Sequence, residues 1–581
     1  MDGGYRTVRF GPPNRDWDTS ETVVGSNENA VLLFFPVRQI HYSAWLLVGL
    51  SSLLQVLTFP LPGMYVLSWL AFAPLIIAVL RARPAGALEI DGSVHLQAAT
   101  PGQAFLLAYT SGIFWYAGTC YWIYDTMHEH GGLSVPVAAL ALFLFCLYLG
   151  LYHGLFGLLV GLVAGPGRDN RRALIAIPSL WVAVELARTR ITGFPWDLLG
   201  TAQVDNISLS RITTWTGVYG VSFEIMLVNV AVAAAFLVPR KKRSTLLLAS
   251  VAAAGVLQAG RLVDAPRIPA DHAALLVQEN IPVDENWTRD NFERTLRELT
   301  DLSVKAEMSN SLLLSGVRGA APIKPDLIVW PESPAPFFTS DPLFRGPVSE
   351  MARTARSWVV TGSIGSSSAV ENGASGSELF NSAALVSPSG DWTARYDKVH
   401  LVPFGEYLPF PQMFAFAGGL TKEVGEFKKG SSRAPLLAGN IPLGAFICYE
   451  SVFPDEVRRF ADQGAQVFVN LSNDGWYGDS GAYAQHLNQT RMRAIENDRW
   501  ILSATDTGVT ASIDPYGRTV ARLPRKQRGA LIAPYAVSSV TTFYTRHGDW
   551  FAYLCAIISA GALLTRFGLL RNAGKKAETS P

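Results

Sequence analysis

The stretch GAFICYES, residues 444–451, joins a short apolar run to a cysteine, a tyrosine and a glutamate. The run has the length and β-rich composition of a buried strand, so it predicts that Cys448 lies at a strand end. The chain has four cysteines, and the other three, Cys120, Cys146 and Cys555, lie inside long apolar segments. Cys448 is therefore the one cysteine in the large polar part of the chain, without an obvious disulfide partner.

Two more stretches place a charged side chain just beyond an expected strand. DLIVWPES, 326–333, carries Glu332, and RYDKVHLVPFGEYLP, 395–409, carries Lys398 and Glu406. Loops at strand ends commonly hold catalytic groups, because a rigid sheet positions them. A carboxylate, an ammonium and a thiol are the parts of an acyl-transfer site.

Each part has a chemical task in such a site. The carboxylate accepts the thiol proton, since only the thiolate attacks. The ammonium stabilises the thiolate and the oxyanion, and the backbone N–H of Tyr449 offers a second oxyanion donor. Taken singly, the residues have ordinary explanations: a small buried Cys448, a helix-start charge at Glu332 and a solvated Lys398. Their spacing in the sequence does not show that they converge.

The surrounding region, about 264–546, reads as a globular α/β sequence. Short apolar runs predict buried strands at 273–278, 326–330, 357–364, 382–388, 444–448 and 466–472, and amphipathic spacing predicts helices at 291–303, 455–463 and about 482–498. Some of these strands follow one another through turns, as at SPSGDW (387–392). The pattern therefore favours α/β layers around a mixed sheet.

The rest of the chain is apolar enough to lie in a membrane. Hydrophobic residues make up 49% of the chain and charged residues 16%, against about 25% charged in soluble domains. The net charge of +1 gives no sign of a nucleic-acid partner. Apolar runs predict spans at about 43–59, 64–80, 104–124, 135–163, 173–187, 216–238, 245–259 and 549–570.

Basic residues in short loops predict the orientation. With the N-terminus inside, inner loops carry Arg81, Arg83 and RKKR at 240–243, whereas the outer loops 60–63 and 125–134 carry no Lys or Arg. Seven spans then deliver the globular region to the outer face. The expected domains are a polar extension (1–40), a seven-helix membrane domain (41–263), an external catalytic domain (264–546) and a last helix with its tail (547–581).

One outer loop, about 188–215, departs from this charge pattern, because it carries Arg188, Arg190 and Arg211. The same loop contains TGFPWD, 192–197, on the expected face of the globular domain. Its tryptophan is either an interfacial anchor or part of the wall of a lipid-facing cleft.

The motifs resemble a known family. WPES, YDKVHLVPFGEYLP and CYES are similar to the Glu-Lys-Cys motifs of the nitrilase superfamily. Together with the flanking spans, SNDGWYG (472–478) and TGVTA (507–511), they resemble the bacterial apolipoprotein N-acyltransferases. This resemblance implies a multi-pass α-helical membrane domain plus an α/β nitrilase-like α-β-β-α sandwich.

The resemblance also implies an activity. Glu332, Lys398 and Cys448 would form a triad that moves an acyl chain from a phospholipid to the N-terminal amine of a diacylglyceryl-cysteine lipoprotein, by a ping-pong route through a thioester. The implied partners are the phospholipid donor, the lipoprotein acceptor and the lipid bilayer. The implied place is the bacterial inner membrane, with the catalytic domain on the periplasmic face. No metal or soluble cofactor is implied.

Further positions match the family motifs. Glu406 would orient Lys398, Glu450 would support the nucleophile loop, and Trp287 and Trp476 would line the substrate site. The ordinary alternatives are a surface charge for Glu406, a helix-cap carboxylate for Glu450 and a packing role for Trp476. His400 and His486 are expected to be structural.

The apolar loop YLPFPQMFAFAGGL, 407–420, is unusual in an external domain. We interpret it as a lid that dips into the bilayer surface, where Phe410, Phe414 and Phe416 meet acyl chains. A buried loop or a dimer contact is the alternative.

Two other functions remain open from the sequence. A membrane-tethered amidase or nitrilase-type hydrolase would use the same triad with water as the final acceptor. A non-catalytic membrane module could carry a decayed nitrilase-like domain. The many spans argue against the first, since a small polar substrate would not need them, and the intact Glu332, Lys398 and Cys448 argue against the second.

Overall fold

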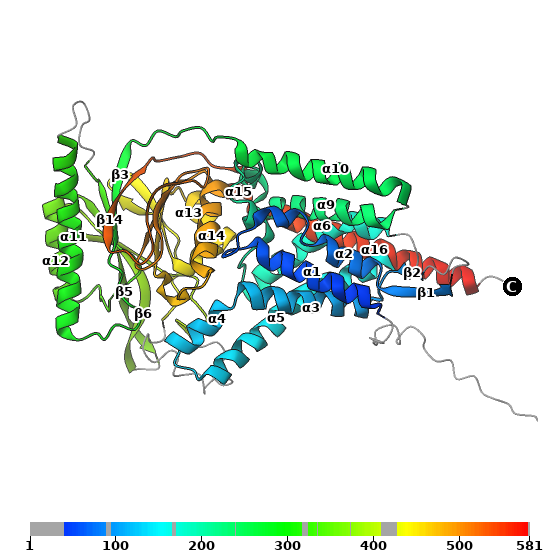
Figure 1. Cartoon of the computed structure of the whole chain (residues 1–581). Helices are drawn as coiled ribbons and strands as arrows, with labels where there is room; N and C mark the ends of the chain where they lie inside the picture. The colour runs from blue at the N-terminus through cyan, green and yellow to red at the C-terminus, as the bar shows by residue number, and fades with distance from the viewer. Residues whose placement is uncertain are drawn as a thin grey trace, which may run out of the picture.

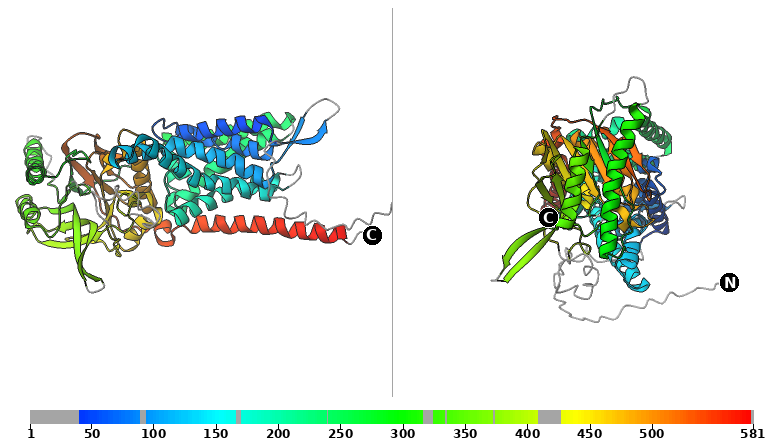
Figure 2. Two further views of the ribbon diagram at one scale, coloured as in Figure 1. Left: turned by 90° about the horizontal axis from the view of Figure 1, so that it is seen from below. Right: turned by 90° about the vertical axis from the view of Figure 1, so that its left-hand side faces the viewer.

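The computed structural model describes residues 40–88, 94–165, 170–238, 240–315, 324–333, 335–371, 374–407 and 427–578. These residues form a helical bundle and a β-sandwich that lie end to end, so the molecule is elongated (Figures 1 and 2). The chain enters the bundle first, builds the sandwich and then returns to the bundle with its last helix (Figure 1).

A helix lies at each of the eight positions expected for a span. These are α1 (Tyr42–Thr58), η3 (Tyr65–Trp69) with α2 (Ala73–Leu80), α3 (Pro101–Thr119), α5 (Val135–Ala164), α6 (Arg171–Ala187), α9 (Val218–Leu237), α10 (Arg240–Ala259) and α16 (Trp550–Glu578). Among the described residues, three helices are long and apolar enough to cross a membrane, at 135–164, 218–237 and 241–262. The multi-pass membrane fold is thus confirmed, while the number of spans stays a prediction.

The outside of the bundle is apolar. Large hydrophobic side chains on four helices are exposed, among them Leu46, Leu144, Val256 and Ile557. Contiguous apolar surface on this scale is costly in water and favourable against lipid tails. The exposed faces of α1, α5, α10 and α16 are therefore the faces that a bilayer would cover.

Helices α3 and α5 pack through a stripe of glycines. Gly150, Gly154, Gly157 and Gly161 recur every three or four residues along α5, which places them on one side of the helix. A Cβ at Gly157 would collide with the backbone carbonyl of Ala104 on α3. The stripe therefore lets the two helix backbones approach closely, as small residues do in membrane bundles.

The three arginines that depart from the loop charge pattern are all engaged. Arg188 is buried and donates from Nη1 to the Tyr116 hydroxyl at 3.0 Å. Arg190 and Arg211 form ion pairs with residues of later elements. Arg190 pairs with Asp455 at 2.9 Å and with Asp549 at 2.6 Å, and Arg211 pairs with Asp498 at 2.9 Å. The three arginines thus have partners within the folded protein, which accounts for their presence in this loop.

The sandwich consists of two mixed sheets of six strands within the described residues. One runs β14 (Gly529–Tyr535), β3 (His272–Gln278), β4 (Leu327–Val329), β5 (Trp358–Glu371), β6 (Ala374–Val386), β7 (Trp392–Asp397). The other runs β13 (Thr519–Leu523), β12 (Thr510–Ile513), β11 (Ile501–Thr505), β10 (Val467–Ser472), β9 (Ile441–Ile447), β8 (Leu436–Ala438). Strands β3, β4 and β5 are parallel, as are β9, β10 and β11.

Helices cover both outer faces of the two sheets. α11 (Arg289–Ser315) and α12 (Pro342–Ala355) lie at the end away from the bundle, and α13 (Pro454–Asp462) and α14 (Ala482–Asn497) face the bundle (Figure 1). Along β3, Leu276 points into the core between the sheets, while Leu275 points toward α11 and α12. Because both faces of the strand are buried, its sequence is a continuous apolar run. The expected α-β-β-α sandwich is confirmed.

Several elements differ from the expected bounds, as one span and one pair of strands illustrate. The expected span at 104–124 ends as a helix at Thr119, and the chain continues through α4 (Trp122–Asp125) and a π-turn (Thr126–His130) toward the sandwich. Strands β5 and β6 are longer than expected and form a hairpin that projects from the body (Figure 2, left).

The sandwich docks on the helix ends through hydrogen bonds. Gln485 of α14 donates to the carbonyl of Pro60 at 2.8 Å and accepts from the Trp196 indole at 2.7 Å. Thr126 donates to the carbonyl of Trp476 at 2.8 Å. Trp196, the tryptophan of TGFPWD, is 1% exposed. Its interpretation as an interfacial anchor is therefore wrong, because the indole is enclosed between the two parts of the chain.

Alanine substitutions at two glycines, one in the stripe and one outside it, should change stability in opposite directions. Gly157→Ala should lower the free energy of unfolding by about 1–3 kcal/mol, because the new methyl group overpacks the contact with α3. Gly255→Ala on exposed α10 meets nothing within 4 Å, and it should raise helix stability by up to about 1 kcal/mol. Thermal melting of both variants in one detergent checks this, and a stabilised Gly157→Ala would contradict the close packing.

Candidate active site

The ends of both sheets meet at one edge of the sandwich. Cys448 directly follows β9, Asn473 directly follows the neighbouring parallel strand β10, and Glu332 follows β4 of the other sheet. The backbone N–H of Asn473 donates to Oε2 of Glu332 at 3.0 Å. This bond ties the loop of one sheet to the carboxylate of the other, so residues far apart in the sequence share one site.

Lys398 lies at the centre of this edge, between two carboxylates. Its Nζ is 2.9 Å from Oε1 of Glu406 and 3.3 Å from Oε1 of Glu332, and its side chain is 1% exposed. Glu406 also accepts from the backbone N–H of Val402 at 2.7 Å. The structure thus places the side chains of Glu332, Lys398 and Glu406 in contact, which the spacing in the sequence could not show.

Asn381 is a member of the cluster that sequence reasoning missed. Its amide nitrogen donates to Glu332 at 2.8 Å and to Glu406 at 2.6 Å, and its backbone carbonyl accepts from the N–H of Lys398 at 2.8 Å. Asn381 therefore links the two carboxylates. The signal available in the sequence is an amide directly before the run SAALV (382–386).

The electrostatics of the cluster keep Lys398 charged. Burial opposes the charged form, but the carboxylates of Glu332 and Glu406 outweigh it and raise the pKa of Lys398 above its ordinary value. A buried ammonium is stable only when it is paired in this way. The site therefore contains a permanent positive charge beside the nucleophile loop.

Cys448 occupies a sharp turn between strand and helix. Its backbone φ is +48°, a left-handed conformation that non-glycine residues rarely adopt, and η9 (Cys448–Val452) begins at this residue. Such conformations cost about 1–3 kcal/mol and persist where the surroundings enforce them. Cys448 thus lies at a strand end, as expected, and at the start of a short helical turn.

The thiol of Cys448 is protonated at rest. Burial is the largest cause that raises its pKa well above the ordinary value, and the charge of Glu332 adds to it. The Lys398 ammonium acts in the opposite direction, but it does not reverse the shift. To act as the nucleophile expected from the sequence, such a thiol would need a base at the moment of attack, which is the role expected for Glu332.

Glu450 connects the nucleophile turn to the lysine loop. One oxygen accepts from the Tyr396 hydroxyl and the Val399 N–H, each at 2.7 Å, and from the His400 N–H at 3.0 Å. The other oxygen accepts from the Ile447 N–H at 2.8 Å. The carboxylate thereby fixes the segment on either side of Lys398 against the end of β9. The bond to Ile447 caps the start of η9, so the helix-cap alternative is present in the structure. The supporting role expected for Glu450 stays a prediction.

Tyr449 joins the same turn to the helical bundle. Its hydroxyl donates to the carbonyl of Gly193 at 3.1 Å, and its ring packs edge-on against Phe453 with centroids 5.1 Å apart. Gly193 belongs to TGFPWD, so that loop touches the residue next to the nucleophile. Its oxyanion role involves the backbone N–H and stays a prediction.

The expected substrate-binding residues are scattered. Trp476 is half-buried where the sandwich meets the bundle, with its ring 5.5 Å from that of His130. Trp287 packs against the hydrophobic core between the sheet and the helices α11 and α12. Cys448 belongs to the other core, between the two sheets. Phe410, Phe414 and Phe416 lie outside the described residues, as does the rest of the expected lid from residue 408 onward.

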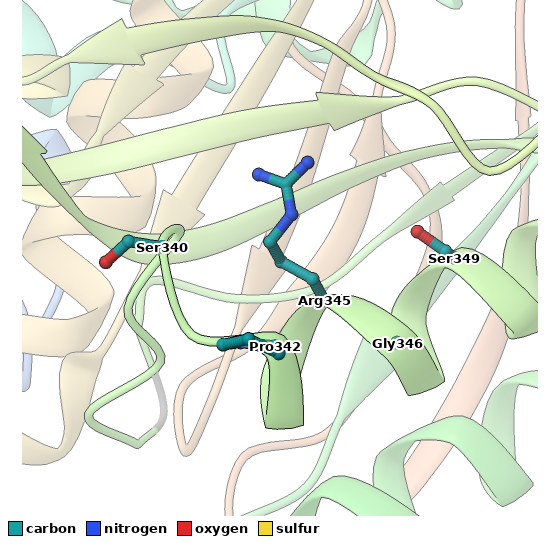
Figure 3. A pocket seen from close by; sticks show the side chains of 5 residues that line it. All are labelled: Ser340, Pro342, Arg345, Gly346 and Ser349. Carbon is teal, nitrogen blue, oxygen red and sulfur yellow. The ribbon is translucent and has the colours of Figure 1, made fainter.

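A separate hollow of about 490 Å³ lies at the start of α12 (Figure 3), the helix at the end of the molecule away from the bundle (Figure 1). Its lining consists of Ser340, Pro342, Arg345, Gly346 and Ser349, on and before α12. No member of the Lys398 cluster lines it. Within the described ranges, no three His, Cys, Asp or Glu side chains are grouped to hold a metal ion.

Comparisons with known proteins agree with this architecture. The family profile described as the apolipoprotein N-acyltransferase N-terminal domain matches residues 51–231, and the carbon-nitrogen hydrolase profile matches residues 277–544. An apolipoprotein N-acyltransferase of Geobacter metallireducens is 34% identical over 523 residues, which cover 88% of this chain and 93% of that protein.

A second relative and a solved structure extend the comparison. An apolipoprotein N-acyltransferase of Methylococcus capsulatus is 33% identical over 83% of this chain and 91% of its own length. The crystal structure of an amidase from Nesterenkonia sp. aligns with 49% of this chain and 97% of that chain, at 19% identity and a TM-score of 0.32.

The raised thiol pKa can be measured by alkylation. The rate of Cys448 modification by iodoacetamide, followed by mass spectrometry, should still be rising above pH 9, later than for free cysteine with its pKa of about 8.5. Glu332→Gln removes a negative charge that raises the thiol pKa, so its profile should move to lower pH even though acyl chemistry is lost. A wild-type plateau near pH 7 would contradict the protonated resting thiol.

Proposed function

The chain belongs to the apolipoprotein N-acyltransferase family, and on that premise we propose that it transfers an acyl chain from a phospholipid to a lipoprotein. The acceptor is the N-terminal amine of a diacylglyceryl-cysteine, and Cys448 carries the acyl chain as a thioester between the two half-reactions. One observation carries the proposal: the Lys398 ammonium lies between Glu332 and Glu406 and acts electrostatically on the Cys448 thiol.

In the first half-reaction, Glu332 takes the thiol proton while Sγ of Cys448 bonds to the ester carbonyl carbon. The carbonyl oxygen becomes an oxyanion, which the Lys398 ammonium and the Tyr449 N–H stabilise. The ester C–O bond then breaks. Glu332 returns the proton to the departing glycerol oxygen, and a lysophospholipid leaves.

In the second half-reaction, the neutral amine of the lipoprotein attacks the thioester carbonyl carbon. The same two donors stabilise the new oxyanion, and Glu332 accepts the proton that the amine loses as the amide forms. The C–S bond breaks, the thiolate takes that proton from Glu332, and the enzyme returns to its starting state.

The two carboxylates take different roles beside the ammonium. Glu406 has the shorter ion pair with Lys398, 2.9 Å against 3.3 Å for Glu332, and it holds the ammonium in place. Each carboxylate also accepts a backbone N–H, Glu406 from Val402 and Glu332 from Asn473. Among the charged groups, Glu332 has the largest effect on the pKa of the Cys448 thiol, and this supports Glu332 as the base.

We also propose that the sandwich lies on the extracytoplasmic face of the bacterial inner membrane. The loop that contains Pro60 has no Lys or Arg and contacts the sandwich. The hairpin β1 (Arg83–Leu88) and β2 (Val94–Gln97), which follows Arg81, lies at the opposite end of the bundle (Figure 1). The proposed domains are 1–40, 41–263, 264–546 and 547–581.

A two-stage acylation experiment tests the proposal. The purified full-length protein is incubated with phospholipid that carries a labelled acyl chain, and the label should appear on Cys448 by mass spectrometry. Addition of a diacylglyceryl peptide with a free amine should then move the label to that peptide. Absence of a thioester in the wild type would refute the mechanism.

Two further outcomes separate the alternatives. A thioester that is released only to water would indicate a hydrolase in place of the acyltransferase. Cys448→Ser should reduce turnover by at least about 10³-fold, because the serine alkoxide is much harder to generate than a thiolate.

A further inference from the structure

His486 contacts the nucleophile turn, and the mechanism above does not use it. It lies on α14, is 2% exposed, and comes within hydrogen-bond distance of three groups. Nδ1 is 3.1 Å from Oδ1 of Asp474, and Nε2 is 3.1 Å from the carbonyl oxygen of Cys448 and 2.8 Å from Oγ of Ser451. One nitrogen of this buried histidine therefore lies against the backbone carbonyl of the proposed nucleophile.

The hydrogen bonds of His486 depend on protons on its ring. A carboxylate oxygen and a peptide carbonyl can only accept, so the bonds to Asp474 and to the Cys448 carbonyl each require an N–H on the ring, whereas the Ser451 hydroxyl can donate or accept. Burial opposes the charged ring, but the Asp474 carboxylate outweighs it and raises the pKa of His486. Asp474 is itself held by the Ser472 hydroxyl at 2.7 Å.

The plane of the imidazole is fixed from two sides. The Trp196 ring is parallel to it, with an interplanar angle of 2° and centroids 6.2 Å apart, and the Tyr477 ring approaches it edge-on at 5.7 Å. The Trp196 indole is in turn anchored on Gln485, the neighbour of His486 on α14. The direction of the Nε2–H bond is therefore determined by the docked TGFPWD loop.

The bond to Cys448 has a consequence for the next residue. The carbonyl of Cys448 and the N–H of Tyr449 belong to one planar trans peptide, in which the two groups point in opposite directions. A donor that holds the carbonyl oxygen therefore aims the Tyr449 N–H the other way. A charged donor on the carbonyl also polarises the peptide and makes its N–H a stronger donor.

We propose that His486 is a positioning residue that orients the Cys448–Tyr449 peptide, so that the Tyr449 N–H is held toward the oxyanion of the acyl group. This inference rests on the proposed function, because it assigns the residue that prepares one of its two oxyanion donors. The bond from His486 to the Cys448 carbonyl also helps to hold Cys448 in its left-handed backbone conformation.

Two isosteric variants separate this role from a general structural one. In His486→Gln, the amide nitrogen takes about the position of Nε2 and keeps the bond to the Cys448 carbonyl. In His486→Asn, the amide nitrogen takes about the position of Nδ1, keeps the bond to Asp474 and does not reach that carbonyl. The exposed His547→Asn on α15 (Phe543–His547) serves as the matched control.

The measurement is single-turnover acylation of full-length protein by labelled phospholipid in mixed micelles, with iodoacetamide alkylation of Cys448 in parallel. His486→Asn should lose about 10²-fold in the saturating acylation rate, as for loss of an oxyanion donor, with the half-saturating lipid concentration unchanged. His486→Gln should stay within about tenfold of wild type, and His547→Asn should match it. Alkylation proceeds without an oxyanion and should change less than threefold in all variants.

Four outcomes would overturn the inference. Equal losses in His486→Gln and His486→Asn would show that the carbonyl bond is not the important one. A parallel loss of alkylation would show that His486 shapes the thiol or the fold instead of the oxyanion donor. Wild-type protein without any thioester would refute the proposed function, and this inference with it, whereas a wild-type thioester with unaffected variants would refute the inference alone.

Discussion

The buried ammonium of Lys398 is the constraint on which the arrangement of the site depends. A lysine that is 1% exposed requires anionic partners, and the structure supplies two, Glu332 and Glu406, from different loops. Burial raises the pKa of the Cys448 thiol and the charge of Glu332 adds to this shift, while the Lys398 ammonium opposes it. Glu332 and Lys398 therefore both stabilise the cluster and act on the thiol.

The loops that carry these groups are held by backbone hydrogen bonds to buried side chains. Glu450 accepts N–H groups from both sides of Lys398 and from the end of β9, while Asn381 links the two carboxylates. A carboxylate with several donors has a fixed position, so it transmits the rigidity of the sheets to the loops. The left-handed backbone of Cys448 is maintained by this shell and not by its own preference.

The sequence predicted the strands whose runs are short, apolar and buried on both faces, such as β3 and β10, and it placed the charged residues at their ends. It did not predict β11 to β14, where polar residues such as Ser503 and Thr505 occupy buried positions. It also missed Asn381, whose importance arises from contacts between residues 25 to 49 positions apart. Trp196 was ambiguous because the partner that buries it, Gln485, is 289 residues away.

The joint between bundle and sandwich explains why a membrane part and a catalytic part are one cooperative structure. Arg190, in the turn that follows α6, pairs with Asp455 in the first turn of α13 and with Asp549, which precedes α16. TGFPWD reaches the same turn through the bond from Tyr449 to Gly193. Separation of the two parts would expose these charges and the Trp196 ring together, at a cost in both unpaired charge and apolar surface. The position of Cys448 relative to the helical bundle is therefore set by the packing of the protein itself.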